Sequence, residues 1–315
     1  MIEKKIAFLG LENSGITSFI VILHRKFDIE KELRNVKPSK SIQRTEFQFI
    51  NHKFLNLDFS GNISERTQYL ANKEQNFAQI DLFFFIVDIQ NPQTFDEALE
   101  YFGSVLSYLK EINRKVPVIV SFHKLDPNIT ADPTIIENLN QMQEKLQPWL
   151  DFTKFQFCTS TIFETQTMIR AYSAGLRSMY DQSEVVQNYM LDLTQTVENI
   201  ISFLLFDSHG FLVGEYFLEQ MTTDQKKILS KLFTFMEKRI YDNEKDDYEF
   251  SERIDAWTEI SNLVQTFEIG GIVFYTLLVL QGHEDKEKLD EISIQFRQFI
   301  PGLKNILAGL MKIED

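Results

Sequence analysis

Two glycines near the start of the sequence are spaced as in loops that bind phosphate groups. Gly10 ends a short apolar run, and Gly15 precedes an apolar stretch with helical spacing. Glycines at this interval let backbone N–H groups point at one anion, and the positive end of the following helix adds to the attraction. Thr17 carries the hydroxyl that would ligate Mg²⁺. The candidate phosphate-binding residues are Gly10, Asn13, Ser14, Gly15, Ile16, Thr17 and Ser18.

The loop departs at one place from the phosphate-loop pattern G-x-x-x-x-G-K-[ST], because Ile16 stands where the pattern has lysine. That lysine would make charge-assisted hydrogen bonds to the outer phosphates, each contributing about 1.5–3 kcal/mol. We expect its loss to weaken triphosphate binding by at least about tenfold. An ordinary glycine-containing turn between a strand and a helix also fits these residues.

A second candidate segment is Asp58-Phe-Ser-Gly61-Asn62, at the end of a strand-like run. An aspartate here can hold Mg²⁺ through water. A glycine three residues later can offer its N–H to a phosphate, since it has no side chain to block the approach. The alternative is a simple turn in which Asp58 bonds its own backbone.

Two later strand ends carry residues suited to a purine base. In His123-Lys124-Leu125-Asp126, the carboxylate of Asp126 could accept hydrogen bonds from N1 and N2 of guanine, and the aliphatic part of Lys124 could cover the ring. A backbone N–H in Cys158–Thr161 could read guanine O6. For the segment 123–126, a solvated loop is the alternative. The candidate base-binding residues are His123, Lys124, Asp126, Thr159, Ser160 and Thr161.

The elements that would position these residues alternate between strand and helix. Continuous apolar runs predict buried parallel strands, and an alternation of strands and helices predicts a mostly parallel sheet covered on both faces. In such sheets ligands bind beyond the carboxyl ends of the strands, which is where the motifs lie. Their joint order predicts a G-domain fold. We expect strands at 6–9, 46–50, 54–58 (after a turn at 51–52), 82–87, 116–122 and 155–158, and helices at 17–24, 95–112 and 139–149.

The second half of the sequence predicts a smaller α+β domain with one antiparallel sheet. Two β-rich runs flank Asp207-Ser-His-Gly210, which indicates a hairpin with a short turn. We therefore divide the chain into domains 1–182 and 183–315. The remaining expected elements are helices at 183–198, 226–240 and 285–303, an acidic loop at 243–249, and a segment at 268–280 that contains Gly270-Gly271 and then a buried strand.

Composition narrows the class of protein. The chain has 315 residues, and 32 basic against 46 acidic residues give a formal net charge of −14. This balance argues against a nucleic-acid binder or a polybasic membrane binder. One cysteine excludes an intramolecular disulfide, and the scattered histidines make a zinc site unexpected. We see no targeting, lipidation or membrane-spanning pattern, so we expect a cytoplasmic protein that reaches a membrane only through a partner.

The phosphate loop, the His-Lys-x-Asp motif and the stretch Thr159–Thr165 together resemble the Rag/Gtr branch of the Ras-like small GTPases, and Pro38-Ser39 is similar to the Pro-Thr of their first switch segment. The resemblance implies GTP or GDP and Mg²⁺ as ligands, with Thr17, Ser39 and Asp58 at the metal. Gly61 belongs to the implied second switch. Asn62 lies where the family has the glutamine that orients the attacking water, and it is shorter by one methylene group.

The C-terminal half is similar to the roadblock domain of the same family. The resemblance implies a homo- or heterodimer formed through residues 183–315, and regulatory proteins that contact the switch segments around 35–45 and 60–75. Two functions stay open. One is a guanine-nucleotide-binding regulatory protein with weakened or absent GTP hydrolysis, and the alternative is a nucleotide-free scaffold that pairs with an active GTPase. An ATP-using enzyme is disfavoured, because Asp126 would repel the acceptor N1 of adenine.

Overall fold

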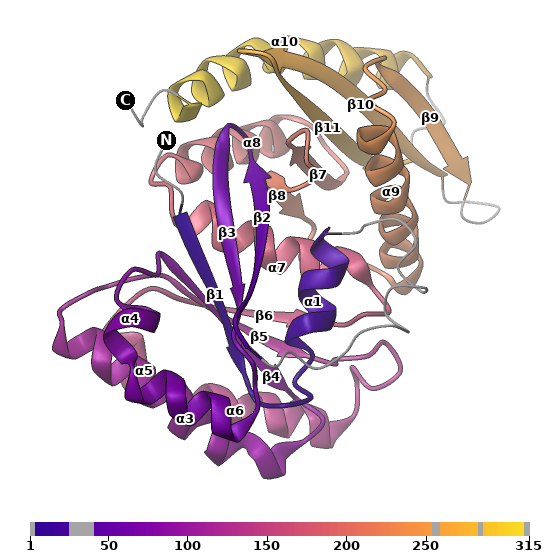
Figure 1. The fold of residues 1–315 in the computed structure, drawn as a ribbon. Coiled ribbons are helices and arrows are strands. Elements are labelled where there is room, and N and C mark those ends of the chain that lie inside the picture. The colour runs from indigo at the N-terminus through magenta and orange to yellow at the C-terminus, as the bar shows by residue number, and fades with distance from the viewer. Residues whose placement is uncertain (1–3, 25–40, 254–258, 283–285, 312–315) are drawn as a thin grey trace. The chain divides into compact units, whose positions relative to one another are not determined.

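The computed structural model describes residues 4–24, 41–253, 259–282 and 286–311, and Figure 1 shows the path of the chain. It divides into two units, one of residues 1–48 and 52–179 and the other of residues 49–51 and 180–315. Each unit has its own sheet, and we describe them separately. No helix within the described ranges is long and apolar enough to cross a membrane.

The first unit contains a six-stranded sheet in the order β2-β3-β1-β4-β5-β6. The pairs β3–β1, β1–β4, β4–β5 and β5–β6 are all parallel. This confirms the predicted mostly parallel sheet, and the carboxyl ends of these five strands therefore lie along one edge. The strands are β1 (Lys4–Gly10), β2 (Gln43–Phe49), β3 (His52–Asp58), β4 (Leu82–Asp88), β5 (Val118–His123) and β6 (Phe155–Ser160).

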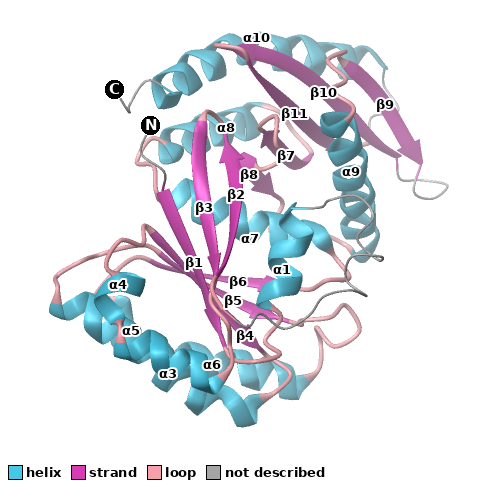
Figure 2. Cartoon of the chain, viewed as in Figure 1, coloured by secondary structure: helices cyan, strands magenta, loops and turns pink. Residues whose placement is uncertain are grey.

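Helices cover both faces of this sheet, as the ribbon in Figure 2 shows. On one face, Phe8 of β1 stacks on Phe84 of β4 with ring centroids 4.8 Å apart, and Tyr172 of α7 stacks on Phe84 at 5.7 Å. On the other, residues of α5 join the main apolar cluster with the alternate side chains of β1 and β4. The helices are α1 (Ile16–His24), α3 (Ile63–Ala71), α4 (Lys73–Phe77), α5 (Phe95–Glu111), α6 (Pro133–Leu150) and α7 (Thr165–Ser178), with a short 3₁₀ turn at Pro92–Thr94.

The second unit has a five-stranded sheet in the order β8-β7-β11-β10-β9, with antiparallel pairing throughout. Phe203 of β7 meets Phe296 of α10 edge to face, while Phe206 meets Phe233 of α9. Because side chains alternate along a strand, these helices lie on opposite faces of the sheet. The elements are α8 (Ser183–Thr196), β7 (Ile200–Phe206), β8 (Leu212–Phe217), α9 (Thr223–Tyr241), β9 (Tyr248–Arg253), β10 (Glu259–Ile269), β11 (Ile272–Gln281) and α10 (Lys286–Met311).

The predicted hairpin around residues 207–210 is confirmed, and one side chain explains its turn. The carboxylate of Asp207 is fully buried and accepts hydrogen bonds from the backbone N–H groups of His209 and Phe211 at 3.0 and 2.9 Å. Asp207 and His209 therefore serve the turn. The order helix, hairpin, helix, strands, helix also matches the prediction.

Several expected boundaries were wrong. The turn between β2 and β3 lies at Ile50-Asn51, one residue earlier than expected, and Ile50 takes a left-handed φ of 55°. The acidic loop is shorter than expected, because Tyr248 already begins β9. The last helix contains Pro301 and runs on to Met311, beyond the expected end at residue 303. Strands β9 and β10 and helices α3, α4 and α7 were not anticipated.

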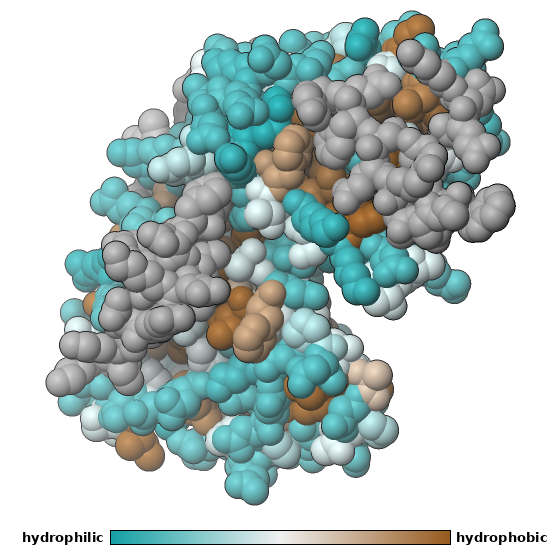
Figure 3. Space-filling view, turned by 90° about the vertical axis from the view of Figure 1, so that its right-hand side faces the viewer, coloured by the Kyte–Doolittle hydropathy of each residue, from teal (hydrophilic) through white to brown (hydrophobic). Residues whose placement is uncertain are grey.

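Hydrophilic side chains dominate the face drawn in Figure 3, where hydrophobic residues outside the grey atoms form small separate groups. The large apolar side chains with high exposure are scattered over both units, for example Ile63 at 66% and Phe163 at 70%. Single exposed apolar residues of this kind are ordinary at protein surfaces.

Candidate functional site

The predicted phosphate loop is a tight turn between β1 and α1. Asn13 and Gly15 have φ angles of 65° and 98°, in the left-handed region. A Cβ atom on Gly15 would lie 2.4 Å from Cδ2 of His123, so glycine is required both for the backbone conformation and for the approach of this ring. The hydroxyl of Ser14 is buried in the loop without a hydrogen-bond partner among the described residues.

Ile16 begins α1 and fills the place of the missing cation with apolar atoms. Its side chain is 6% exposed, and its Cδ1 would be 3.1 Å from a Cβ on Gly10. The side chain therefore packs against the start of the loop. Of residues 10–18, only Glu12 carries a charge, and it is exposed. The loop thus offers backbone amides and a helix N-terminus to an anion, with no positive side chain of its own.

Thr17 and Asp58 come together at the carboxyl ends of β1 and β3. The Thr17 hydroxyl donates a hydrogen bond to Oδ2 of Asp58 at 3.1 Å, and Asp58 is 4% exposed. A hydroxyl and a buried carboxylate are ligands that suit Mg²⁺, which usually keeps further positions for water and phosphate. Ser39, the third expected metal ligand, lies outside the described residues. Those residues hold no cluster of three or more His, Cys, Asp or Glu side chains placed for a metal ion.

Asn62 caps helix α3. Its side-chain Oδ1 accepts hydrogen bonds from the backbone N–H and the hydroxyl of Ser64 at 3.0 and 2.8 Å. Asparagine is among the preferred residues at such a cap. The preceding Gly61 lies directly against the phosphate loop, because a Cβ there would be 2.3 Å from the carbonyl carbon of Leu11. The side chain of Asn62 is therefore engaged with its own helix.

A buried arginine that sequence reasoning missed holds this segment in place. Nε of Arg66 donates to the carbonyl oxygen of Gly61 at 2.9 Å, and its guanidinium also forms an ion pair with Glu97 of α5. The same group lies over the ring of Tyr101, 5.3 Å from the centroid. Burial raises the pKa of Tyr101 well above its ordinary value, with the nearby Tyr69 adding to the shift and Arg66 opposing it.

His123 is buried between the phosphate loop and β6. Its Nδ1 is hydrogen-bonded to the Ser160 hydroxyl at 2.8 Å, and that hydroxyl is 2.7 Å from the hydroxyl of Ser121. Burial, with a smaller effect of the charge on Lys124, lowers the pKa of His123 from 6.5 to about 4. The ring is therefore neutral at pH 7, and it packs between the phosphate loop and the sheet.

The carboxylate of Asp126 is held by Thr161. The Thr161 hydroxyl donates to Oδ1 of Asp126 at 2.6 Å, although the two residues are 35 positions apart in the sequence. Ser160, which is 1% exposed, contacts His123 instead. Thr159 is exposed, and since side chains alternate along β6, it points to the other face from Ser160. The structure thus brings Thr161 to Asp126, rather than Thr159 or Ser160.

The segment after β4 also reaches these residues. Oδ2 of Asp88 forms an ion pair with Nζ of Lys124 at 2.7 Å, and Nε2 of Gln90 donates to Oδ2 of Asp126 at 3.0 Å. Lys124 has a left-handed φ of 63°. Sequence reasoning had a signal for both contacts, because Asp88 and Gln90 follow a predicted strand just as the recognised motifs do. It had none for Arg66, whose role depends on the packing of α3 against α5.

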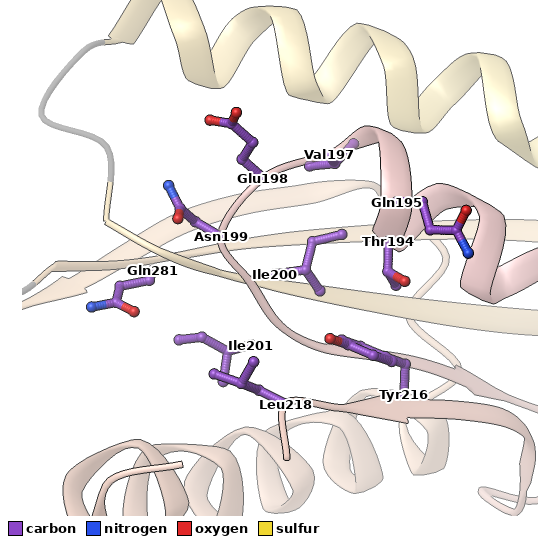
Figure 4. A pocket seen from close by; sticks show the side chains of 10 residues that line it. All are labelled: Thr194, Gln195, Val197, Glu198, Asn199, Ile200, Ile201, Tyr216, Leu218 and Gln281. Atoms are coloured by element: carbon purple, nitrogen blue, oxygen red, sulfur yellow. The ribbon is translucent and has the colours of Figure 1, made fainter. Parts of the chain in front are cut away.

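A separate cavity of about 420 Å³ lies in the second unit, and Figure 4 shows its lining. Amide and aliphatic side chains, together with Thr194 and Tyr216, surround it, and they come from the end of α8 and from β7, β8, β11 and the residues next to them. Its only acidic side chain is that of Glu198, which is 79% exposed and 3.5 Å from Nζ of Lys288. This lining offers neither a nucleophile with a base nor a set of metal ligands. The polar side chains that contact one another as a site in the described residues are those at the carboxyl edge of the sheet in the first unit.

A comparison with known families agrees with this geometry. Residues 5–263 match the model of the Gtr1/RagA G protein conserved region. The matched range contains the phosphate loop, Asp58, Gly61, the His-Lys-x-Asp motif and Thr161, and it covers most of the chain. The resemblance inferred from the motifs is confirmed, and this chain belongs to the Gtr1/RagA family of G proteins.

Proposed function

We propose that this chain is a guanine-nucleotide-binding regulatory subunit of the Rag/Gtr type with weak or absent GTP hydrolysis. The family is one of G proteins, which bind guanine nucleotides. The observation that carries the proposal for this chain is the hydrogen bond from Thr161 to Asp126. It holds a half-buried carboxylate at the carboxyl edge of the sheet, where N1–H and N2–H of guanine are matching donors.

The phosphate and metal positions fit a nucleotide with Mg²⁺. Gly10, Asn13, Ser14, Gly15 and Ser18 would surround the phosphates with backbone amides and hydroxyls, and the unpartnered Ser14 hydroxyl is consistent with a polar group that a ligand or water satisfies. Thr17 and Asp58 would hold Mg²⁺, with Ser39 as a further ligand. When bound, Mg²⁺ would neutralise phosphate charge that the loop, which has no cation, leaves exposed.

Three features of the chain argue against efficient hydrolysis. Ile16 supplies packing where phosphoryl transfer needs positive charge. The side chain of Asn62 is committed to Ser64 as a helix cap, so its amide is not held toward an attacking water. Arg66 anchors the carbonyl of Gly61 to α5 through Glu97. We therefore favour a protein that holds GDP or GTP without turning it over quickly.

The rest of the proposal concerns partners. Family members work as dimers, and we assign the dimer contact of this chain to residues 183–315, in a homo- or heterodimer. Regulatory proteins would contact the segments 35–45 and 60–75, of which residues 35–40 lie outside the described residues. We place the protein in the cytoplasm and at membranes only through a partner.

The second candidate function is a nucleotide-free scaffold that pairs with an active GTPase. The buried apolar side chain of Ile16 and the exposed charge of Glu12 favour it, because both weaken the attraction of the loop for polyphosphate. The two proposals share the fold and the pairing and differ only in whether the site is filled.

Native mass spectrometry of the purified full chain tests the choice between them. We expect the mass of a bound guanine nucleotide, a dimer, and GTP turnover that Ile16→Lys increases because it restores the missing charge. Lys110→Ala, at an exposed lysine of α5, serves as a surface control. A chain that binds neither GDP nor GTP with millimolar Mg²⁺, but still forms a dimer with an active GTPase, would support the scaffold function. Rapid hydrolysis by the unsubstituted chain would contradict both proposals.

A further inference from the structure

Asp88, at the end of β4, and Gln90, just after it, make three polar contacts with residues 124–126, the base-binding loop. Asp88 pairs with the Lys124 ammonium at 2.7 Å, and the side-chain nitrogen of Gln90 donates to the carbonyl oxygen of Lys124 at 2.7 Å and to Oδ2 of Asp126 at 3.0 Å. A primary amide has two N–H donors. Gln90 therefore uses both of them on the same loop.

Gln90 is itself held firmly at its backbone. Its N–H donates to Oδ1 of Asp88 at 3.1 Å. The neighbouring Ile89 donates to the carbonyl oxygen of His123 at 3.1 Å and accepts a hydrogen bond from Nδ2 of the buried Asn138 at 2.9 Å. The side-chain amide thus starts from a fixed main chain, so it can fix the loop in turn.

The two oxygens of Asp126 are held by two different segments of the chain. Thr161 donates to Oδ1 and Gln90 to Oδ2. An ionised carboxylate offers about four lone-pair positions, so each oxygen keeps one position for a further donor. Guanine presents two donors side by side, N1–H and N2–H. These two hydrogen bonds therefore fix the orientation of the carboxylate plane. They leave two acceptor positions, which is the number that N1–H and N2–H of guanine require.

We propose that Gln90 is a positioning residue for guanine selection, which orients the Asp126 carboxylate through Oδ2 as Thr161 does through Oδ1. This inference rests on the proposed function of the same site. The alternative occupant of Oδ2 is the base itself, with Gln90 as a plug that it must displace. The bond of Nε2 to the Lys124 carbonyl favours positioning, because it ties the amide to the loop rather than only to the ligand-binding carboxylate.

The test is the base selectivity of the full chain with Mg²⁺, measured by competition of GDP, IDP and XDP against a fluorescent GDP. IDP lacks the 2-amino group and makes one bond fewer to Asp126. We expect Gln90→Ala and Gln90→Met, which keeps the length but lacks the donors, to lower GDP affinity about fivefold to tenfold and the GDP-over-IDP preference at least about threefold. A merely structural role would weaken both nucleotides equally.

Two reference variants calibrate the measurement. Gln79→Ala removes an exposed glutamine that contacts Lys5 outside the site, and it should leave the preference unchanged. Asp126→Asn should exchange GDP for XDP, since xanthine carries an acceptor where guanine has its 2-amino donor. Unchanged selectivity, or tighter GDP binding, in both Gln90 variants overturns this inference alone. Absence of GDP binding by the unsubstituted chain overturns it together with the proposed function.

Discussion

At the scale of single residues, His123 links three parts of the site. Its ring lies against Gly15 of the phosphate loop, bonds Ser160 of β6, and meets Phe19 of α1 edge to face with centroids 6.0 Å apart. A shorter residue would leave a gap between the loop and the sheet. The position therefore demands a flat, uncharged ring with one hydrogen-bonding nitrogen toward Ser160.

This burial makes stability depend on pH. The pKa of His123 is about 4 in the folded chain and near 6.5 when unfolded. Below pH 6.5 the unfolded chain therefore binds a proton that the folded chain does not bind, so the free energy of unfolding decreases as the pH is lowered. The loss reaches about 3 kcal/mol once the pH is below the folded value. Lys124 lowers this pKa further, and Asp88 and Asp126 oppose it.

Urea unfolding at pH 7.0, 5.5 and 4.5 checks the prediction when the chain is compared with His123→Gln. The variant should lose less stability between these pH values, because it cannot take up the proton. His24→Gln, at an exposed histidine in α1, is the control and should follow the unsubstituted chain. Parallel curves for all three proteins would contradict the assignment.

Candidate residues could be predicted from one rule, that ligands bind at the carboxyl ends of parallel strands. Residues were missed where this rule was not applied or where it does not hold. Gly15 directly precedes α1, while Asp58 ends β3 and Asp126 lies just after β5, and topology alone brings such positions to one edge. Asp88 and Gln90 obey the same rule and could have been found with it. Thr161 was distinguished from Ser160 only by the structure, because the direction of each side chain depends on where β6 ends.

At the scale of elements, helix α3 is held to α5 by a buried ion. The side chain of Arg66 is 9% exposed, while that of its partner Glu97 is 50% exposed. Because the guanidinium is buried, leaving it unpaired would cost free energy. Arg66 also donates to the carbonyl oxygen of Gly61, which belongs to the segment that lies on the phosphate loop. The position of this segment therefore depends on α5 as well as on a ligand.

Arg66→Met should lower the free energy of unfolding by about 1–3 kcal/mol, because the Gly61 carbonyl and Glu97 lose a charged donor. Hydrogen exchange should rise most in residues 61–71. Lys145→Met is the matched control, because Lys145 of α6 pairs with Asp96 of α5, which is 86% exposed. Exposed pairs contribute about 0–1 kcal/mol. Equal losses in the two variants would show that Arg66 does not anchor the helix.

Element prediction succeeded for strands whose burial shows as continuous apolar runs. Strand β4 reads Leu-Phe-Phe-Phe-Ile-Val-Asp and was placed within one residue. Strand β10 was missed because Ser261, Asn262, Gln265 and Thr266 interrupt its apolar pattern, although most of these side chains are buried in the sheet. Helix α10 passes through Pro301 because packing against the sheet outweighs the loss of one backbone hydrogen bond.

At the scale of the whole molecule, each half of the chain builds a separate sheet and core. Part of the order of elements in both halves was predictable, because it follows from runs of hydrophobic residues and glycine-containing turns, but α3, α4, α7, β9 and β10 were not predicted. The inclusion of residues 49–51 in the second unit was not. Ile50 donates its backbone N–H to the buried Asp207 at 2.8 Å, a bond between residues 157 positions apart that no local pattern announces.

A nucleotide that binds only the first unit should stabilise that unit alone. With GDP at 100 times its dissociation constant, mass action adds about 2.7 kcal/mol to the free energy of unfolding, which corresponds to a rise in Tm of about 5–10 °C for a unit of this size.

The chain has two tryptophans, Trp149 in α6 and Trp257 in the residue range of the second unit. Trp257→Phe leaves a reporter in the first unit, and Trp149→Phe one in the second. We expect Mg²⁺-GDP to raise only the transition reported by Trp149, ADP to raise neither, and Asp126→Asn to abolish the effect of GDP. A shift of both transitions with GDP would mean that the two units unfold together.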